Sequence, residues 1–478
     1  MLNRRAFIGA LAGMVLAPTW ARADTAEPSD ASLIDDIERR TFNLFWEQVN
    51  HRNGLMPDRW PTTSFCSITA TGFALTAWPI GVERGWIRRD EARDLTLRTL
   101  RFLEKLPQGE QTVGTAGYRG FYYHFLDMET GLRYADNELS TVDTAWLQLG
   151  MAFAQGWYDR ESEAEIEIRV LTQRLLDRTE WDWIQAHSTG GKGITMGWHP
   201  EHGFIARNWE GYNEGMAVYL LALGSKSHTV NDSAYDVWTA SYPRFWRGEG
   251  TKRYLSFAPH FGHQWGPIWI DYRGIRDATM RAAGFDYFEN CRRATYAQRD
   301  YAIANPLRWD GYSKDIWGMT ACDGPGEVVI DFKGKPTHFY GYRAYGPMGM
   351  PDGADDGVLA PTAAVASIAF APEICIPAAH ALRHFQGGHL YGRYGFYDSF
   401  CPSFHDTHAK LERGSVDRHL GWVDSDYLGV DQGPILGMIA NYKTGIVWNA
   451  TRKAPNLVRG LKRAGYAGGW LDRSRDNL

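Results

Sequence analysis

The chain has 478 residues, of which 44% are hydrophobic and 22% charged, and its formal net charge is −5. A negative net charge without long Lys or Arg runs excludes a nucleic-acid backbone as the partner. The length allows two or three average domains, but composition does not divide the chain, and helical barrels often exceed the mean domain size. The cysteines are too scattered for a disulfide framework or a C-x-x-C metal site, and we expect them to be buried: Cys66, Cys291, Cys322, Cys375 and Cys401.

Residues 1–23 are predicted to be a signal peptide rather than part of the fold. Arg4 and Arg5, followed by Phe7, are typical of the twin-arginine (Tat) export route, and an A-x-A-like cleavage site ends at Ala23. The apolar run between them is too short to span a bilayer. We therefore expect a periplasmic, monomeric protein without a membrane anchor, whose residues 24–478 form one domain.

Two kinds of helical segment alternate along the rest of the chain. Residues 88–103 and 161–178 are amphipathic with a charged face, which indicates helices with one solvated side. Segments that begin near residues 67, 140, 213, 360 and 432 are rich in small residues and nearly uncharged, which indicates buried helices. Their starts are about 70 residues apart except for one double gap, where residues 265–270 offer a sixth.

Outer and inner helices that alternate six times close into a ring. The pattern therefore predicts an all-α fold, a single (α/α)6 toroid. Residues 117–126 and 328–332 favour strands, which we interpret as small β-hairpins on the loops.

Acidic residues recur at the beginnings of the predicted inner helices, where they would converge on one end of the ring. N-capping alone explains many such acids. Glu214 and Asp398, however, lie among aromatic residues, where desolvation raises the pKa of a carboxyl toward that of a general acid. The full set is Asp143, Glu214, Asp355, Asp356 and Asp431, with Asp398 in a glycine and aromatic turn.

Aromatic residues make up 14% of the chain, and aromatic faces both stack on sugar rings and fill cores. The sequence has no G-x-S-x-G elbow, P-loop or dinucleotide fingerprint. His260 and His263 lack a clear third ligand, so we expect no metal and no cofactor. The candidate sugar platforms, some of which core packing would claim, are Trp60, Trp198, Trp209, Tyr212, Trp265, Trp317 and Phe396.

Ordered motifs across residues 33–465 resemble the glucoamylase-like domain of glycoside hydrolase family 144. They are N-G-L-M-P-D-R (53–59), S-I-T-A-T-G-F (67–73), P-I-G-V-E-R-G-W-I (79–87), S-T-V-D-T-A (140–145), Y-N-E-G-M (212–216), D-D-G-V-L-A-P-T-A-A (355–364), Y-G-F-Y-D-S-F (394–400) and Y-L-G-V-D-Q-G-P-I (427–435). The resemblance implies an (α/α)6 domain, inverting chemistry and β-1,2-glucan or sophoro-oligosaccharides as substrate. Transglycosylation of cyclic β-1,2-glucan and non-catalytic glycan binding remain alternatives, as do endo and exo action.

The same motifs imply roles for individual residues. Matched in this way, Glu214 is expected to be the general acid and Asp398 the base that activates water, directly or through a substrate hydroxyl. Asp143 and Glu138 would bind sugar hydroxyls or tune this pair. The remaining substrate-binding candidates, beside the aromatic residues, are Glu210, Arg343 and Asp431. Residues 327–340 lengthen a linker and predict an extra hairpin at one end of the cleft.

Overall fold

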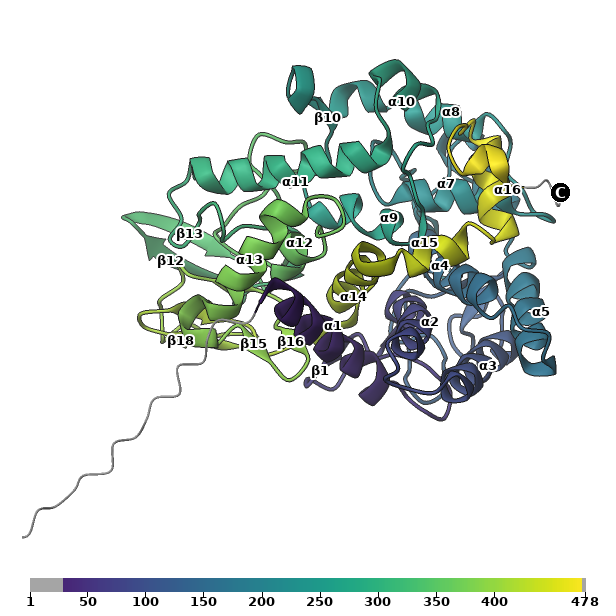
Figure 1. Ribbon diagram of the computed structural model, residues 1–478, viewed down its shortest axis with the longest axis horizontal. Helices are drawn as coiled ribbons and strands as arrows, with labels where there is room; N and C mark the ends of the chain where they lie inside the picture. Colours follow the sequence, from purple (N-terminus) through teal and green to yellow (C-terminus); the bar gives the residue numbers. More distant parts are fainter. Residues whose placement is uncertain (1–28, 475–478) are drawn as a thin grey trace, which may run out of the picture.

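The computed structural model describes residues 29–474, so the predicted signal peptide at 1–23 lies outside the described residues. Within this range the chain forms an inner ring of helices surrounded by outer ones (Figure 1). Each inner helix begins within a few residues of its predicted start, and the (α/α)6 prediction is confirmed. The inner helices are α2 (Ile68–Glu83), α4 (Thr141–Trp157), α7 (Gly215–Gly224), α9 (Trp265–Trp269), α12 (Pro361–Val365) and α14 (Gly429–Thr444).

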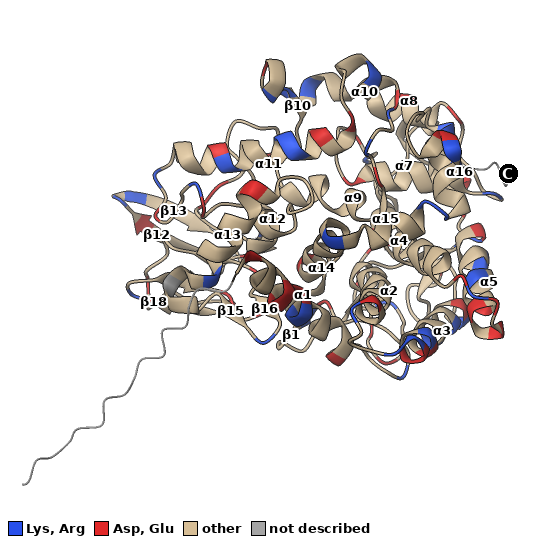
Figure 2. Cartoon of the chain, in the orientation of Figure 1, with Lys and Arg blue, Asp and Glu red and all other residues tan. Residues whose placement is uncertain are grey.

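The outer helices carry more charge than the inner ones. Figure 2 shows Lys, Arg, Asp and Glu gathered on α3, α5 and α11, whereas α7 carries none. The outer helices are α1 (Asp30–Glu47), α3 (Arg89–Lys105), α5 (Glu163–Asp177), α8 (Ala234–Thr239), α11 (Tyr287–Ala304) and α13 (Pro372–His384). Four further helices cover the ring: α6 (Trp181–Ala186), α10 (Ala278–Ala283), α15 (Ile446–Thr451) and α16 (Pro455–Arg463).

Small residues let the inner helices approach closely, as their composition predicts. A Cβ added at Gly72 on α2 would lie 2.7 Å from the Trp146 carbonyl oxygen on α4, and one at Gly150 would collide with the backbone of Gly72. Aromatic rings fill the centre of the ring beneath this contact, where Phe73 and Trp146 both stack on Trp269 with centroids 5.0 and 5.8 Å away. This packing makes the ring a solid core rather than a pore.

Short antiparallel strands tie the loops together at one end of the ring. β2 (Cys66–Ser67) pairs with β5 (Phe125–Leu126), and β6 (Leu139–Ser140) pairs with β7 (Gly197–His199), which also pairs with β8 (Gly203–Phe204). Ser67 and Ser140 end their strands and cap α2 and α4, because their hydroxyl oxygens accept bonds from the amides of Ala70 and Asp143. The inner helices therefore begin from a common strand-rich end.

The remaining strands complete this end of the molecule. β1 (Arg59–Trp60) pairs with β20 (Tyr427–Leu428), which joins the first inner helix to the last, and α1 packs beside α14. β12 (Val328–Phe332) and β13 (Lys335–Phe339) form the hairpin predicted within residues 327–340. The other pairs are β3 (Gly117–Tyr118) with β4 (Phe121–Tyr122), β9 (Trp246–Arg247) with β10 (Tyr254–Leu255), β11 (Ala321–Asp323) with β14 (Tyr342–Ala344), β15 (Tyr391–Gly392) with β16 (Gly395–Phe396), and β19 (Gly421–Val423) with both β17 (Phe400–Cys401) and β18 (Ser415–Asp417).

Candidate active site

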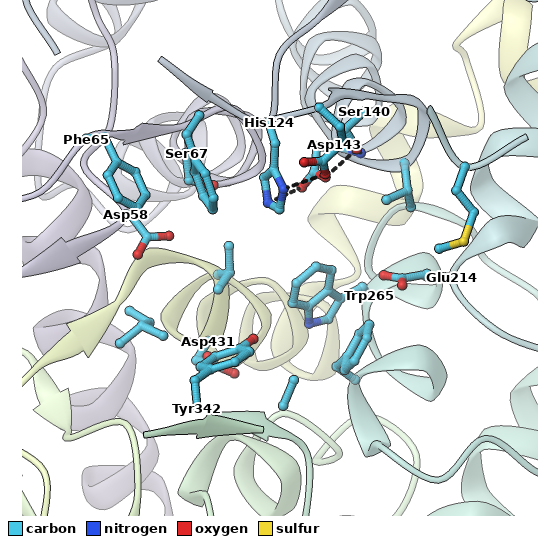
Figure 3. A pocket seen from close by; sticks show the side chains of 18 of the residues that line it. Asp58, Phe65, Ser67, His124, Ser140, Asp143, Glu214, Trp265, Tyr342 and Asp431 are labelled. Atoms are coloured by element: carbon cyan, nitrogen blue, oxygen red, sulfur yellow. Dashed lines mark hydrogen bonds and ion pairs between the residues drawn. The ribbon is translucent and has the colours of Figure 1, made fainter. Parts of the chain in front are cut away.

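A cavity of about 740 Å³ lies at the strand-rich end, where the inner helices begin. Its wall combines carboxylates, cations and aromatic rings, and Figure 3 shows Glu214 and Asp431 on different sides of Trp265. The carboxylates are Asp58, Glu138, Asp143, Glu214 and Asp431; the cations are Arg59, His124 and Arg207; and the aromatic residues are Phe65, Phe125, Trp209, Phe261, Trp265 and Tyr342. This mixture is typical of a site that binds a polar, ring-shaped ligand.

Glu214 is the N-cap residue of α7 and faces the cavity. The amide of Gly215 donates to the Asn213 side-chain oxygen at 2.8 Å. Among residues 29–474, no hydrogen bond or ion pair engages the Glu214 carboxyl. Burial, and then the nearby Asp143 charge, raise the pKa of Glu214 to about 8, although His124 opposes this. Glu214 is therefore protonated at neutral pH, as a general acid must be.

Asp143 lies beside Glu214 and is fixed by several donors. Its Oδ1 accepts from the Thr69 hydroxyl at 2.6 Å and its Oδ2 from the Ser140 hydroxyl at 2.5 Å. The His124 Nε2 lies 3.4 Å from Asp143 Oδ1 (Figure 3). Its Nδ1 lies 2.9 Å from Glu138 Oε1, so His124 bridges the two carboxylates. Burial lowers the pKa of His124, but the two carboxylates raise it to about 9. The imidazolium therefore balances two negative charges on this wall.

A second group of acids lies behind the opposite wall. Asp323, Asp398, Asp424 and Asp426 are each at most 3% exposed, and the Asp323 amide donates to Asp398 Oδ2 at 2.8 Å. Burial raises the pKa of Asp398 and of Asp424 well above the usual range. Asp431 stands between this group and the cavity, and burial raises its pKa to about 7.

Two arginines neutralise part of this buried charge. Arg59 pairs with Asp58 and with Asp323, and its Nη1 lies 3.5 Å from Asp426 Oδ2. Arg413 lies 3.7 Å from Asp323 and 3.5 Å from Asp426. Asp323, Asp398 and Asp424 bring oxygens within 4.8 Å of one another, as metal ligands would. However, the guanidinium groups already contact Asp323, which disfavours a metal ion there.

The structure brings six of the residues predicted for the site to one cavity. Glu214 and Asp143 line it, together with Glu138, Asp431 and two of the candidate platforms, Trp209 and Trp265. Asp398 is not among the lining residues, and its side chain is 1% exposed, against 3% for the lining residue Asp431. The predicted role of Asp398 as the base, directly or through a substrate hydroxyl, therefore stays a prediction.

Three of the predicted sugar platforms are core residues, and that prediction is wrong for them. Trp317 and Phe396 have no exposed surface. Tyr212 is 3% exposed and stacks on Tyr287 with a centroid distance of 5.7 Å. A ring enclosed on all sides cannot stack on a ligand.

Four other candidates lie away from the cavity wall. Glu210 is an exposed residue that pairs with Arg244 at 2.8 Å. Trp60 packs against Tyr394, and Trp198 packs against Tyr118. Arg343 lies over Tyr340 instead, with its guanidinium carbon 4.2 Å from the ring centroid. None of the four lines the cavity, so their assignment to substrate binding stays a prediction.

The sequence reasoning missed four lining residues for which signals existed. Asp58 and Arg59 end the motif N-G-L-M-P-D-R, and His124 follows the aromatic pair at 122–123. Tyr342 precedes Arg343 on β14, and successive side chains of a strand point to opposite faces. The alternation that turns Tyr342 into the cavity therefore turns Arg343 away from it. The hairpin at 327–340 contributes no residue to the wall.

The sequence matches a family model and a curated protein. The Glycoamylase family model, described as "Putative glucoamylase", matches residues 206–455. The chain is 26% identical over 466 residues to the exo β-1,2-glucooligosaccharide sophorohydrolase (non-reducing end) of Parabacteroides distasonis, with 92% of this chain and 59% of that protein covered. The chain thus spans less than two thirds of the length of this curated relative.

Solved structures share the fold over nearly the whole chain. A Bacteroides uniformis protein with the same description as the family model has a TM-score of 0.78 and 27% identity, over 93% of this chain and 99% of that one. An endo-β-1,2-glucanase from Chitinophaga pinensis, solved with sophorotriose and glucose, has a TM-score of 0.76 and 24% identity, over 92% and 99% of the two chains. At that identity the second likeness concerns the fold alone.

Proposed function

The chain belongs to the Glycoamylase family, and from that premise we propose that it is an inverting glycoside hydrolase that cleaves β-1,2-linked glucans. The observation that carries the proposal is Glu214, an unpaired carboxyl with a pKa of about 8 in a cavity lined by aromatic rings and further carboxylates. The sophorohydrolase of P. distasonis supports β-1,2-glucooligosaccharides as the substrate class.

In this mechanism Glu214 donates its proton to the glycosidic oxygen as the bond from that oxygen to the anomeric carbon breaks. A second carboxylate removes a proton from a water molecule whose oxygen bonds to the same carbon from the opposite face. The product is released with the inverted, α configuration. Trp265 and Tyr342 offer ring faces to the sugars, while Asp143, Glu138 and His124 offer donors and acceptors to their hydroxyl groups.

Linear β-1,2-glucan and the mature protein provide the test. We expect new reducing ends, and proton NMR at early times should show the α anomer at the new end. The product lengths separate release of sophorose from cleavage within the chain. Binding without new reducing ends would instead support a glycan-binding protein, and longer or cyclic products would support a transglycosylase. A β anomer seen first would refute inversion.

We also propose that the protein is exported through Tat to the periplasm and acts there as a monomer. The paired arginines and the A-x-A-like site within residues 1–23 support export. In the part of the chain that the structure describes, no helix has the length and apolarity needed to cross a bilayer. Replacement of Arg4 and Arg5 by Lys should leave the enzyme in the cytoplasmic fraction, and light scattering should give the mass of one mature chain.

A further inference from the structure

We infer that Tyr134 is an outer sugar-binding platform for β-1,2-glucan, beyond the cavity, and that it makes the enzyme bind long chains more tightly than short ones. This role rests on the proposed function and deepens it, since it selects substrates by length. Tyr134 lies in the loop between β5 and β6 and is not among the residues that line the cavity.

Exposed aromatic side chains are few, and two of the three lie at the cavity. Among residues 29–474, the most exposed Phe, Trp and Tyr residues are Tyr134 at 45%, Tyr342 at 54% and Tyr442 at 43%. Tyr342 lines the cavity, and Tyr134 contacts a ring that lines it. Tyr442 lies on α14, about 16 Å along the helix axis from the lining residue Asp431. A lone exposed ring is common on a protein surface, whereas exposed rings gathered at a cavity indicate a binding surface.

A row of three contacting rings leads from the cavity wall to Tyr134. Phe125 and Phe65 both line the cavity, and their ring centroids are 4.2 Å apart. Tyr134 packs on Phe65 with a centroid distance of 4.9 Å and an interplanar angle of 39°. These separations are typical of aromatic pairs. The row therefore continues the aromatic wall of the cavity out to the solvent.

The Tyr134 side chain has free capacity for a ligand. Within the described chain it makes a ring contact with Phe65 and takes part in no hydrogen bond or ion pair. Its exposed ring surface can stack on the C–H face of a glucose unit, and its hydroxyl can bond a sugar hydroxyl. A glucan chain that leaves the cavity over Phe65 meets both groups.

The backbone around Tyr134 is fixed, so the ring is in place before a ligand arrives. The Tyr134 amide donates to the Phe125 carbonyl at 3.1 Å. The Asn137 side chain bonds both the amide and the carbonyl of Phe125, each at 3.0 Å. Arg133, which precedes Tyr134, pairs with Glu201 at 2.6 Å. A platform that is ordered in advance loses little conformational freedom on binding.

The row of rings begins on the side of the cavity away from the acid. Phe65 and Glu214 lie on opposite sides of Trp265 (Figure 3). Glu214 donates its proton to the glycosidic oxygen, so the bond that breaks lies beside Glu214. Tyr134 therefore contacts sugar units farther along the chain, which take no part in bond breaking. Such a contact is the same in the ground state and in the transition state, so it acts on KM and not on kcat.

Chain length is the variable that tests this role in the mature enzyme. We expect kcat/KM of wild type to rise with the length of linear sophoro-oligosaccharides until the chain reaches Tyr134, and then to level off. Tyr134→Ala should raise KM for long β-1,2-glucan by about 2–10-fold, because one contact between a sugar and a ring is lost, with kcat unchanged. Its KM for the shortest oligosaccharide that wild type cleaves should match wild type.

Two further variants separate the ring from a structural effect. Tyr134→Phe keeps the ring, so KM for long glucan should stay close to wild type. Tyr442→Ala removes a ring of similar exposure away from the cavity and should match wild type on every substrate. A merely structural role of Tyr134 would instead impair short and long substrates alike, and that result overturns the inference.

A binding measurement keeps this role distinct from the proposed function. Calorimetric titration with long β-1,2-glucan should show about 2–10-fold weaker binding by the double variant Glu214→Gln/Tyr134→Ala than by Glu214→Gln. If wild type cleaves the glucan but Tyr134→Ala has the same KM on long chains, the role of Tyr134 is refuted and the proposed function stands. If wild type cleaves no β-glucan, the proposed function is refuted. Calorimetry then decides the role of Tyr134, which equal binding or no binding by the two variants refutes.

Discussion

Replacement of Glu214 by Gln should make the protein more stable as well as inactive. The pKa of this carboxyl is about 8 in the folded protein against an ordinary value of 4.5, because burial opposes its ionisation. The stability that the protonated group contributes is fully present below pH 4.5 and is lost as pH rises to 8. At about 1.4 kcal/mol per pKa unit, the ionisable carboxyl costs roughly 3 kcal/mol at pH 7 and about 5 kcal/mol above pH 8.

Glutamine cannot ionise and has no such cost at any pH. The free energy of unfolding of the variant should therefore exceed that of wild type by the cost that the ionisable carboxyl has at the same pH. For a chain of this length, 1 kcal/mol corresponds to about 1 °C in Tm. We expect the Tm of Glu214→Gln to match that of wild type near pH 4.5 and to exceed it by roughly 3–5 °C at pH 7–8.5. Scanning calorimetry across this pH range measures the difference, and kcat should fall by about 10²–10⁴-fold in parallel.

Glu210 provides a matched control. It lies four residues earlier, is exposed, and pairs with Arg244 at the surface, where such pairs contribute little. Glu210→Gln should therefore leave Tm and kcat close to wild type at every pH. The reasoning is refuted if Glu214→Gln is less stable than wild type at pH 8, if its Tm difference is independent of pH, or if its kcat is near wild type.

Three further changes test the electrostatics and the binding surface. Loss of the Glu214 proton should produce an alkaline limb near pH 8 in the kcat/KM profile. Asp143→Asn should move this limb to lower pH, because the substitution removes a charge that raises the pKa of Glu214. His124→Gln should move the same limb to higher pH, since the imidazolium lowers that pKa. If both variants shifted the limb in the same direction, one of the two expectations would be contradicted. Trp265→Ala should raise KM about tenfold or more in assays on short oligosaccharides, whereas Trp198→Ala, outside the cavity, should not.

The fold was predictable because its signals are local. Runs of small apolar residues predict buried helices, and hydroxyl caps such as Ser67 and Ser140 fix where two of them begin. The five-residue helix α12 was located from its composition, and α9 was located because its position follows from the repeat. Glu214 and Asp143 were identified for the same reason, because a helix start determines which way the first turn faces.

The remainder of the site depends on contacts between distant segments. The sequence places Asp398 in an uncharged aromatic turn, but only the fold sets Asp431 and Asp323 near it. Composition likewise cannot separate a buried Trp317 from a Trp265 that faces the cavity, since both are tryptophans in apolar surroundings.

The pairing of β1 with β20 determines when a growing chain can become active. The amide of Gly429 donates to the Asp58 carbonyl at 2.8 Å, so one wall of the cavity is completed by a bond between the first and last inner segments. During synthesis β1 leaves the ribosome long before its partner exists, and such a long-range pairing forms late. Activity should therefore appear in a single step, as α14 docks, and a nascent chain that stops short of Asp431 should cleave no glycosidic bond.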